Sequence, residues 1–313
     1  MKRFALLFAA TVAAGGAANG AALQDPTAEN PRRIILDIDP GIDDAMAVLL
    51  ATQSPELQIE AITVVFGNVI VDLGAQNALK LVELAGRPDI IVAKGAKYPL
   101  VKKLVTAEWI HGRNGLGDVE LPTPTKKLDP RHAVDVIIEI VNANPGEITL
   151  VPVGPLTNIA LAFREDPTLP SKVDEIILMG GSIAGGNASP AAEANIYNDP
   201  EAAKIVFNSG APIIMVGLGA TSQTKLYRRH LPRLANSGSP LGKFVADIND
   251  FYIGFAESIG FEGADLHDPL AVGMAFDKTF ATEAEARHAA EVAYLGPDKY
   301  GVGVEWTVEK VGD

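Results

Sequence analysis

Short apolar runs rich in β-branched residues alternate along this chain with longer stretches of helical periodicity. Runs without a polar face must be covered on both sides, which is typical of strands in a parallel sheet. The alternation therefore predicts a single α/β domain, built as a mostly parallel, doubly wound sheet with helices on both faces. We predict strands at residues 34–39, 59–66, 90–93, 147–153, 175–179 and 212–216.

Helical periodicity and helix-start signals separate these strands. Helices are predicted at residues 43–53, 71–85, 129–142, 156–164, 200–208 and 241–259. The Asp-Pro pairs at 129–130, 166–167 and 199–200 each fit an aspartate cap followed by proline in the first helical position. Two apolar runs, 291–295 and 302–308, flank Gly296-Pro297-Asp298 and predict a C-terminal hairpin added at an edge of the sheet.

The amino-terminal residues have the layout of a secretory signal peptide. Lys2 and Arg3 precede an apolar run at 4–14 and a stretch of small residues at 15–22. The apolar run is too short to span a bilayer. We therefore expect residues 1–22 to be removed and residues 23–313 to form the folded domain. The mature protein is then expected to be periplasmic or secreted, without membrane association.

Charge and cysteine usage exclude several classes of function. The chain has no cysteine, which excludes disulfide scaffolds, zinc ribbons and thiol enzymes. It carries 26 Lys and Arg against 39 Asp and Glu, a formal net charge of -13, and this charge repels phosphate backbones. A small neutral or cationic ligand is therefore expected, and nucleic acid is not.

Four aspartates, Asp37, Asp39, Asp43 and Asp44, lie within eight positions where the first strand is predicted to end and the first helix to begin. A helix N-terminus stabilises a negative charge by only about 0.3–1 kcal/mol, which accounts for one or two caps. Crowded carboxylates raise one another's pKa values unless a cation offsets their charge. The cluster therefore predicts a hard divalent cation, Ca²⁺ or Mg²⁺. Asp268 is the best further ligand, with a helix cap as its alternative role.

These residues belong to a larger set of ordered motifs through which the sequence resembles nucleoside hydrolases of the inosine-uridine-preferring type. The resemblance runs from Arg32 to about Thr307. Its motifs are Asp37-Ile38-Asp39-Pro40-Gly41-Ile42-Asp43-Asp44-Ala45, Thr63-Val64-Val65-Phe66-Gly67-Asn68, His111-Gly112-Arg113-Asn114-Gly115-Leu116-Gly117, Val151-Pro152-Val153-Gly154-Pro155-Leu156-Thr157-Asn158, Met179-Gly180-Gly181, Asn187, Glu193-Ala194-Asn195 and His267-Asp268-Pro269.

The resemblance implies a role for each matching residue. Ca²⁺ is expected to be bound by the carboxylates of Asp39, Asp44 and Asp268 and by the backbone carbonyl of Val153. Asp37 is expected to orient its neighbours. The residues implied to hold the substrate are Asp43, Asn68, His111, Met179, Asn187, Glu193 and Asn195. Without the resemblance, Asn187 and Asn195 are ordinary turn residues and Met179 is a core residue. A lone histidine in a Gly-rich loop, such as His111, is as often a surface residue.

The implied reaction is hydrolysis of the N-glycosidic bond of ribonucleosides to ribose and free base, with broad specificity or a preference for inosine and uridine. Asp39 would take a proton from a calcium-bound water, and His267 would protonate the departing base. A histidine at 267, and not a tryptophan, favours the inosine-uridine type. The aromatic partner of His267 is Phe251, Tyr252 or Phe255. A homo-oligomer, dimer or tetramer, is also implied.

Two other functions compete with this interpretation. An Asp-x-Asp after an apolar strand also begins haloacid-dehalogenase-type phosphatases, but these have Thr or Val where this chain has Gly41. An exported, non-catalytic module that binds nucleosides or ribose would retain the fold and the metal. The presence of Asp39, Asn195 and His267 argues against it.

Overall fold

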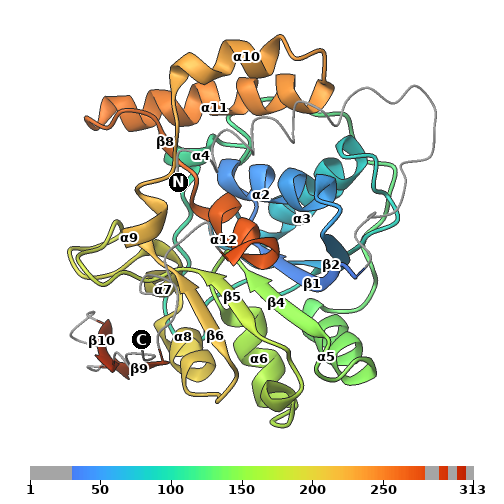
Figure 1. The fold of residues 1–313 in the computed structure, drawn as a ribbon, viewed down its shortest axis with the longest axis vertical. Coiled ribbons are helices and arrows are strands. Elements are labelled where there is room, and N and C mark those ends of the chain that lie inside the picture. The colour runs from blue at the N-terminus through green and yellow to red at the C-terminus, as the bar shows by residue number, and fades with distance from the viewer. Residues whose placement is uncertain (1–29, 279–288, 295–301, 308–313) are drawn as a thin grey trace.

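The computed structural model describes residues 30–278, 289–294 and 302–307 (Figure 1). The predicted signal peptide, residues 1–22, lies outside the described residues. The strands of the main sheet are β1 (Arg32–Ile38), β2 (Leu57–Val64), β3 (Ile91–Lys94), β4 (Ile148–Pro152), β5 (Ile176–Met179) and β6 (Ile213–Val216). The shorter strands are β7 (Lys225–Leu226), β8 (Ala264–Asp265), β9 (Ala289–Tyr294) and β10 (Val302–Thr307).

Helices cover both faces of the main sheet. Figure 1 shows α2, α3 and α12 on one face and α5, α6 and α8 on the other. The helices are α2 (Ile42–Gln53), α3 (Val71–Leu84), α4 (Glu108–His111), α5 (Ala133–Ala143), α6 (Thr157–Glu165), α7 (Ala194–Asn198), α8 (Pro200–Phe207), α9 (Leu218–Thr221), α10 (Leu231–Ala235), α11 (Pro240–Ser258) and α12 (His267–Phe276). Two 3₁₀ helices are η1 (Leu169–Ser171) and η2 (Arg228–His230).

The main sheet is parallel, with the strand order β3-β2-β1-β4-β5-β6. This confirms the predicted single, doubly wound α/β domain. The order of the strands reverses between β1 and β4, which are neighbours. Sheets of this kind bind ligands at such a reversal, beyond the carboxyl ends of the strands. The register places Asp37 of β1 opposite Thr63 on β2 and Pro152 on β4.

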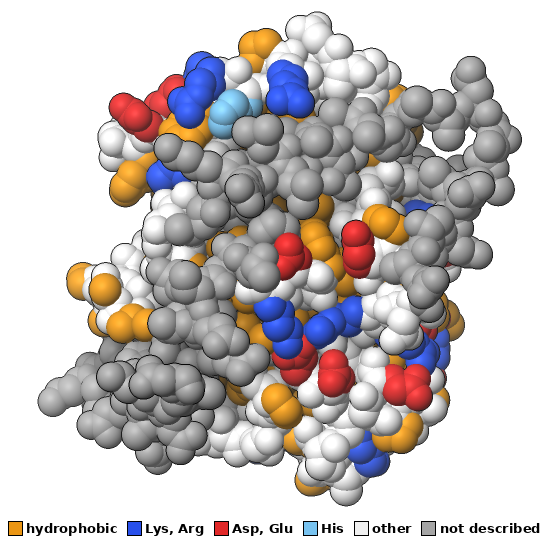
Figure 2. Space-filling model, viewed as in Figure 1, with side chains coloured by type: hydrophobic (Ala, Val, Ile, Leu, Met, Phe, Trp, Pro, Cys, Tyr) orange, Lys and Arg blue, Asp and Glu red, His pale blue; other side chains and the backbone are white. Residues whose placement is uncertain are grey.

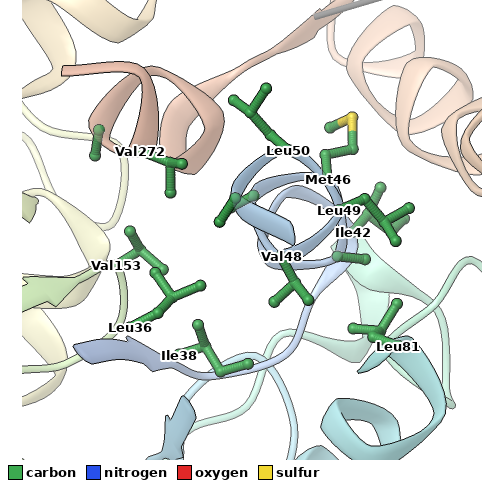
Figure 3. Close-up of a cluster of buried hydrophobic side chains, with 14 of the residues drawn as sticks. Leu36, Ile38, Ile42, Met46, Val48, Leu49, Leu50, Leu81, Val153 and Val272 are labelled. Carbon is green, nitrogen blue, oxygen red and sulfur yellow. The ribbon is translucent and has the colours of Figure 1, made fainter. Parts of the chain in front are cut away.

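Helix α2 is buried on all sides and anchors the strand end that precedes it. Figure 3 shows its side chains directed both toward β1, as for Val48, and away from it, as for Met46 and Leu50. Ten of its twelve residues are buried. A helix that is apolar all round belongs in the core of a larger domain. The start of α2 is therefore held firmly where Asp43 and Asp44 lie.

Two of the three Asp-Pro predictions are wrong. α5 begins at Ala133, with His132 as its N-cap, and not at Asp129-Pro130. The Asp129 carboxylate instead accepts hydrogen bonds from Arg131. Asp166 ends α6 and accepts the backbone N–H of Thr168, so it forms a turn. Asp-Pro suits turns and helix starts alike, and the local sequence does not distinguish them.

The third Asp-Pro prediction and the C-terminal hairpin are present in the structure. Asp199 caps α8 by accepting the backbone N–H of Ala202 at 3.1 Å. β9 and β10 pair in antiparallel fashion. They form a separate two-stranded sheet beside α8 and are not joined to an edge of the main sheet. Within the described part of the chain, no helix has both the length and the apolar character needed to cross a membrane.

Acidic side chains are divided between the surface and the interior. On the face shown in Figure 2, acidic and basic side chains lie beside one another, including over α10 and α11. Among the described residues, seven carboxylates are instead buried and no more than 7 % exposed: Asp37, Asp39, Asp43, Asp44, Glu193, Asp199 and Asp268. Part of the net charge of -13 therefore lies inside the molecule.

Candidate active site

The carboxylate of Asp39 lies just beyond the end of β1, in a space that two glycines leave open. Its Oδ2 accepts the backbone N–H of Asn68 at 2.9 Å. Its Oδ1 has no hydrogen-bond partner among the described residues. A Cβ atom on Gly67 would lie 1.8 Å from Oδ2, and one on Gly154 would lie 2.5 Å from Oδ1. Glycine at both positions therefore allows the ends of β2 and β4 to close around this carboxylate.

Asp44 links the strand end to the helix start. Its Oδ1 accepts the backbone N–H of Asp39 at 3.0 Å, and its Oδ2 accepts that of Gly41 at 2.8 Å. The side chain of Asn68 donates a further bond to Oδ2 at 3.0 Å. Asp44 therefore satisfies backbone donors at the start of α2, as a capping residue does. These bonds also fix its carboxylate beside Asp39.

Asp268 comes from the first turn of α12 and joins this cluster from a distant part of the chain. The carboxylates of Asp43, Asp44 and Asp268 offer oxygens that lie within 4.8 Å of one another. Asp39 is not part of that three-residue group, but its negative charge acts on the group electrostatically. Burial and the charges of Asp43, Asp44 and Asp39 raise the pKa of Asp268 well above its ordinary value. Burial, followed by the charge of Asp44, does the same to the pKa of Asp39.

The donor chemistry of this cluster fits a hard divalent cation. Among the described residues, no Lys or Arg forms an ion pair with Asp39, Asp43, Asp44 or Asp268, and the ring of His111 lies 3.8 Å from Asp43. Asp43 Oδ1, like Asp39 Oδ1, is buried without a hydrogen-bond partner there. Buried carboxylates in this number need a compensating positive charge or a proton. Oxygen donors alone favour Ca²⁺ or Mg²⁺.

Asp37 supports the aspartate cluster from within the core. It is fully buried, and its Oδ1 accepts the hydroxyl of Thr63 at 2.5 Å and the amide of Asn158 at 2.8 Å. Burial raises its pKa to about 7, against the effect of these two bonds. Asn158 also accepts the backbone N–H of Ala96 at 2.9 Å. The sequence motifs contain Thr63 and Asn158, but their pairing with Asp37 required the register of β1 with β2 and the position of the start of α6.

A second polar group lies at the ends of β4 and β5. The side chain of Asn195 donates to the backbone carbonyls of Val153, at 2.8 Å, and Met179, at 3.2 Å. Glu193 is buried, and its carboxylate accepts the backbone N–H groups of Gly181, Asn195 and Ile196. Burial nevertheless raises its pKa. The structure therefore brings Asn195 to the Val153 carbonyl, and Glu193 holds the backbone on either side of it.

His111 is buried, which contradicts its interpretation as a surface residue. Its Nδ1 accepts the backbone N–H of Ile42 at 3.1 Å, and its ring centre lies 5.5 Å from that of Tyr252 on α11. Burial lowers its pKa, so the neutral form is favoured. Tyr252 is also buried, and its pKa is raised by burial and by Asp43, Asp265 and Asp268.

A cavity of about 1060 Å³ lies at the mouth of this site. His267, Tyr252 and Phe255 line it, whereas Phe251 does not. Of the three aromatic residues that the sequence left open as partners of His267, Tyr252 and Phe255 therefore remain. Asn187 lines the same cavity from the loop after β5, where its Oδ1 accepts the backbone N–H of Ala194 at 2.9 Å. The size is that of a small-molecule site.

Comparison with known proteins identifies the family of this chain. A family model described as inosine-uridine preferring nucleoside hydrolase matches residues 34–310. The chain is 45% identical over 260 residues to uridine nucleosidase 1 of Arabidopsis thaliana, covering 82% of this chain and 76% of that protein. It is 45% identical over 243 residues to the pyrimidine-specific ribonucleoside hydrolase RihA of Photobacterium profundum, covering 77% and 78%. The solved purine-preferring ribonucleoside hydrolase from Gardnerella vaginalis matches with a TM-score of 0.83 and 38% identity, over 89% of each chain.

Proposed function

The chain belongs to the inosine-uridine preferring nucleoside hydrolase family and is a ribonucleoside hydrolase, and we propose that it depends on Ca²⁺ and accepts both inosine and uridine. The observation that carries the calcium dependence is the group formed by Asp43, Asp44 and Asp268, buried and without Lys or Arg partners among the described residues. The proposed ligands are the carboxylates of Asp39, Asp44 and Asp268 and the backbone carbonyl of Val153, whereas Asp43 is assigned to the sugar. When bound, Ca²⁺ supplies a fixed positive charge that holds oxygen ligands and lowers the pKa of a neighbouring water.

Asp39 is the proposed general base. Its Oδ2 is held by the backbone of Asn68, so the free oxygen, Oδ1, is the atom that accepts a proton from the attacking water. A raised pKa suits this task, because a base with a pKa nearer to neutral holds the proton it has taken. Water then adds to the anomeric carbon as the N-glycosidic bond breaks, and ribose and the base are released.

The sugar is proposed to be bound by the polar group around Glu193 and Asn195, together with Asp43, Asn68 and Asn187. The oxygens of Glu193 are fixed by three backbone donors, so a ribose hydroxyl meets an acceptor that is already oriented. Orientation before the reaction lowers the entropy cost of reaching the transition state. Acidic surroundings also stabilise the positive charge that develops on the ribose ring.

The proposed acceptance of both bases rests on the relatives and on the cavity. The relatives are named for uridine, pyrimidine and purine nucleosides. One wall of the cavity is formed by Phe255, Trp109 and Ile110 and is apolar. Such a wall has no pattern of hydrogen-bonding groups that would select one base over another. A panel of kcat/KM values over natural nucleosides, with and without EDTA, tests the proposal. Phosphate release without ribose release, or activity that EDTA leaves intact, would contradict it.

Gly67→Ala is expected to lower kcat/KM on inosine and uridine by roughly 100-fold, because the new methyl group displaces the Asp39 carboxylate by an ångström or more. Gly254→Ala on α11 is the matched control, since its Cβ would meet only the side chain of Arg228, at 3.9 Å. Steady-state kinetics of both variants check this. Wild-type activity in the Gly67 variant would show that the position of Asp39 is not critical.

His267→Ala is expected to slow the hydrolysis of inosine by roughly 10²–10⁴-fold, the range of a lost general acid. A p-nitrophenyl riboside should be hydrolysed nearly as fast as by the wild type, because its leaving group departs without a proton. The ratio of the two kcat/KM values measures the acid role. An equal loss on both substrates would remove His267 from that role.

Export is proposed from the amino-terminal layout, and a homo-oligomer from the family resemblance. Cleavage after about residue 22 would remove Lys2 and Arg3. Mass spectrometry of the protein from a native-like export host reports the mature terminus, and light scattering reports the oligomeric state. An intact Met1 or a monomer would overturn the respective proposal.

A further inference from the structure

One nitrogen of the His267 ring is held by Thr221. The Oγ1 atom of Thr221 lies 2.8 Å from His267 Nδ1, and among the described residues this is the hydrogen bond that the ring makes. Thr221 is fully buried at the end of α9, the short helix that follows β6. A threonine hydroxyl can donate and accept, so it can pair with either tautomer of the ring.

The opposite edge of the ring is left for the substrate. His267 lines the cavity, whereas Thr221 is absent from its walls. With Nδ1 turned toward Thr221, Nε2 faces the cavity side, where it lies 3.9 Å from Oδ2 of Asp265, another wall residue. Lys225 forms an ion pair with Asp265, which holds that carboxylate in place.

The turn that begins at Thr221 also anchors the backbone that leads into His267. The N–H of Leu266 donates to the carbonyl of Thr224 at 2.8 Å, and the N–H of Thr224 donates to the carbonyl of Thr221 at 3.0 Å. Backbone bonds fix the chain but not the ring. The last torsion of histidine is broad and roughly two-fold, and a half turn about it would put Cδ2 in the place of Nδ1 and Cε1 in the place of Nε2. A side-chain partner is therefore needed to select one orientation.

We propose that Thr221 is a positioning residue, whose hydroxyl fixes the ring of His267 so that Nε2 is presented to the departing base. The proposal rests on the acid role proposed for His267 in the same site. Thr221 does not touch the substrate, and it acts through the ring alone. Its removal should therefore slow only those substrates whose leaving group needs a proton.

The test compares Thr221→Val, which keeps the shape but removes the hydroxyl, with Thr221→Ser, which keeps the hydroxyl. Thr224→Val is the matched control, because Thr224 is equally buried in the same turn and its hydroxyl has no partner among the described residues. For Thr221→Val we expect kcat/KM to fall by roughly 10-fold or more on inosine and uridine, with less than a two-fold change on the p-nitrophenyl riboside. Thr221→Ser should restore the nucleoside rates, and Thr224→Val should leave all rates unchanged.

Ring ¹⁵N spectra of the histidine-labelled, calcium-loaded enzyme give a second readout. Thr221→Val should shift the Nδ1 resonance of His267, because that nitrogen loses its hydrogen bond, and Thr221→Ser should not. Normal nucleoside rates, equal losses on all substrates, failure of the serine variant to rescue, or an unchanged Nδ1 resonance would each overturn the proposal. If the wild type releases no ribose from any substrate, the proposed function fails instead, and the spectra still decide the role of Thr221.

Discussion

Asp39→Asn is expected to reduce ribose release from inosine and uridine by at least roughly 100-fold, the lower end of the contribution of a general base. The substitution keeps the size of the side chain, and an amide still accepts the backbone N–H of Asn68. It removes the negative charge and the basic oxygen that faces the site. The same change removes one proposed Ca²⁺ ligand, so the affinity for calcium should also fall.

Two controls distinguish a loss of catalysis from a loss of folded structure. Asp72→Asn changes an exposed carboxylate that pairs with Lys94 at 2.7 Å, and its activity should stay within two-fold of the wild type. Circular dichroism should show the Asp39 variant folded, because neutralising a crowded carboxylate with a raised pKa relieves repulsion. Turnover near the wild-type rate in a folded Asp39 variant would refute its role as the base.

Removing the metal is expected to have the second large effect. Dialysis against a chelator should abolish ribose release, and Ca²⁺ should restore it at lower concentrations than Mg²⁺. Chelation should also lower the melting temperature, because a ligand at 100 times its Kd stabilises the folded state by about 2.7 kcal/mol. Kinetics and thermal melts on the same samples measure both effects. Full activity after exhaustive chelation would show that the carboxylate cluster serves another purpose.

The pH dependence of the metal-free protein follows from the same carboxylates. Burial raises the pKa of Asp37 and of Asp44 from 3.8 to about 7, so between these values the folded state binds more protons than the unfolded state. The free energy of unfolding therefore falls as pH rises through this window. The contribution of these groups is fully present below about pH 4 and lost near pH 7.

Calcium should reverse this trend, because it binds ionised carboxylates. The gap in melting temperature between the calcium-loaded and the chelated protein should therefore widen from pH 5 to pH 7.5. Thermal melts at the two pH values, with and without a chelator, measure the gap. A gap that narrows with pH would contradict the proposed ligation of calcium by Asp39, Asp44 and Asp268.

Most of the fold could be predicted from local pattern. The strands and helices of the main sheet lie within a few residues of their predicted places, because an apolar run or an amphipathic stretch shows its period in the sequence. The starts of α5 and η1 could not be predicted in this way. An aspartate before a proline offers the same local bonds in a turn as at a helix start, and only the packing of the following segment selects one.

The candidate site likewise has a part that the sequence predicts and a part that only the structure shows. Asp37, Asp39, Asp43 and Asp44 are neighbours in sequence, so their crowding was visible without a structure. The surroundings of Asp39 were not visible in the sequence, because Gly67 and Gly154 approach it from the ends of two other strands. The motifs named His267 and Asp268, yet the partner of the His267 ring, Thr221, carries no signal in the sequence. A lone buried threonine resembles any other core residue until its neighbour is known.

By itself, the sequence determined the parallel α/β architecture, the acidic loop after the first strand and the absence of thiol chemistry, because periodicity, spacing and composition are local properties. The tertiary structure decided which distant groups meet. It brought Asp268 to Asp43 and Asp44, excluded Phe251 as the partner of His267 and placed Thr221 against His267. The rotation of a helix about its axis and the approach of remote segments depend on the packing of the whole core, and no short stretch of residues contains that information.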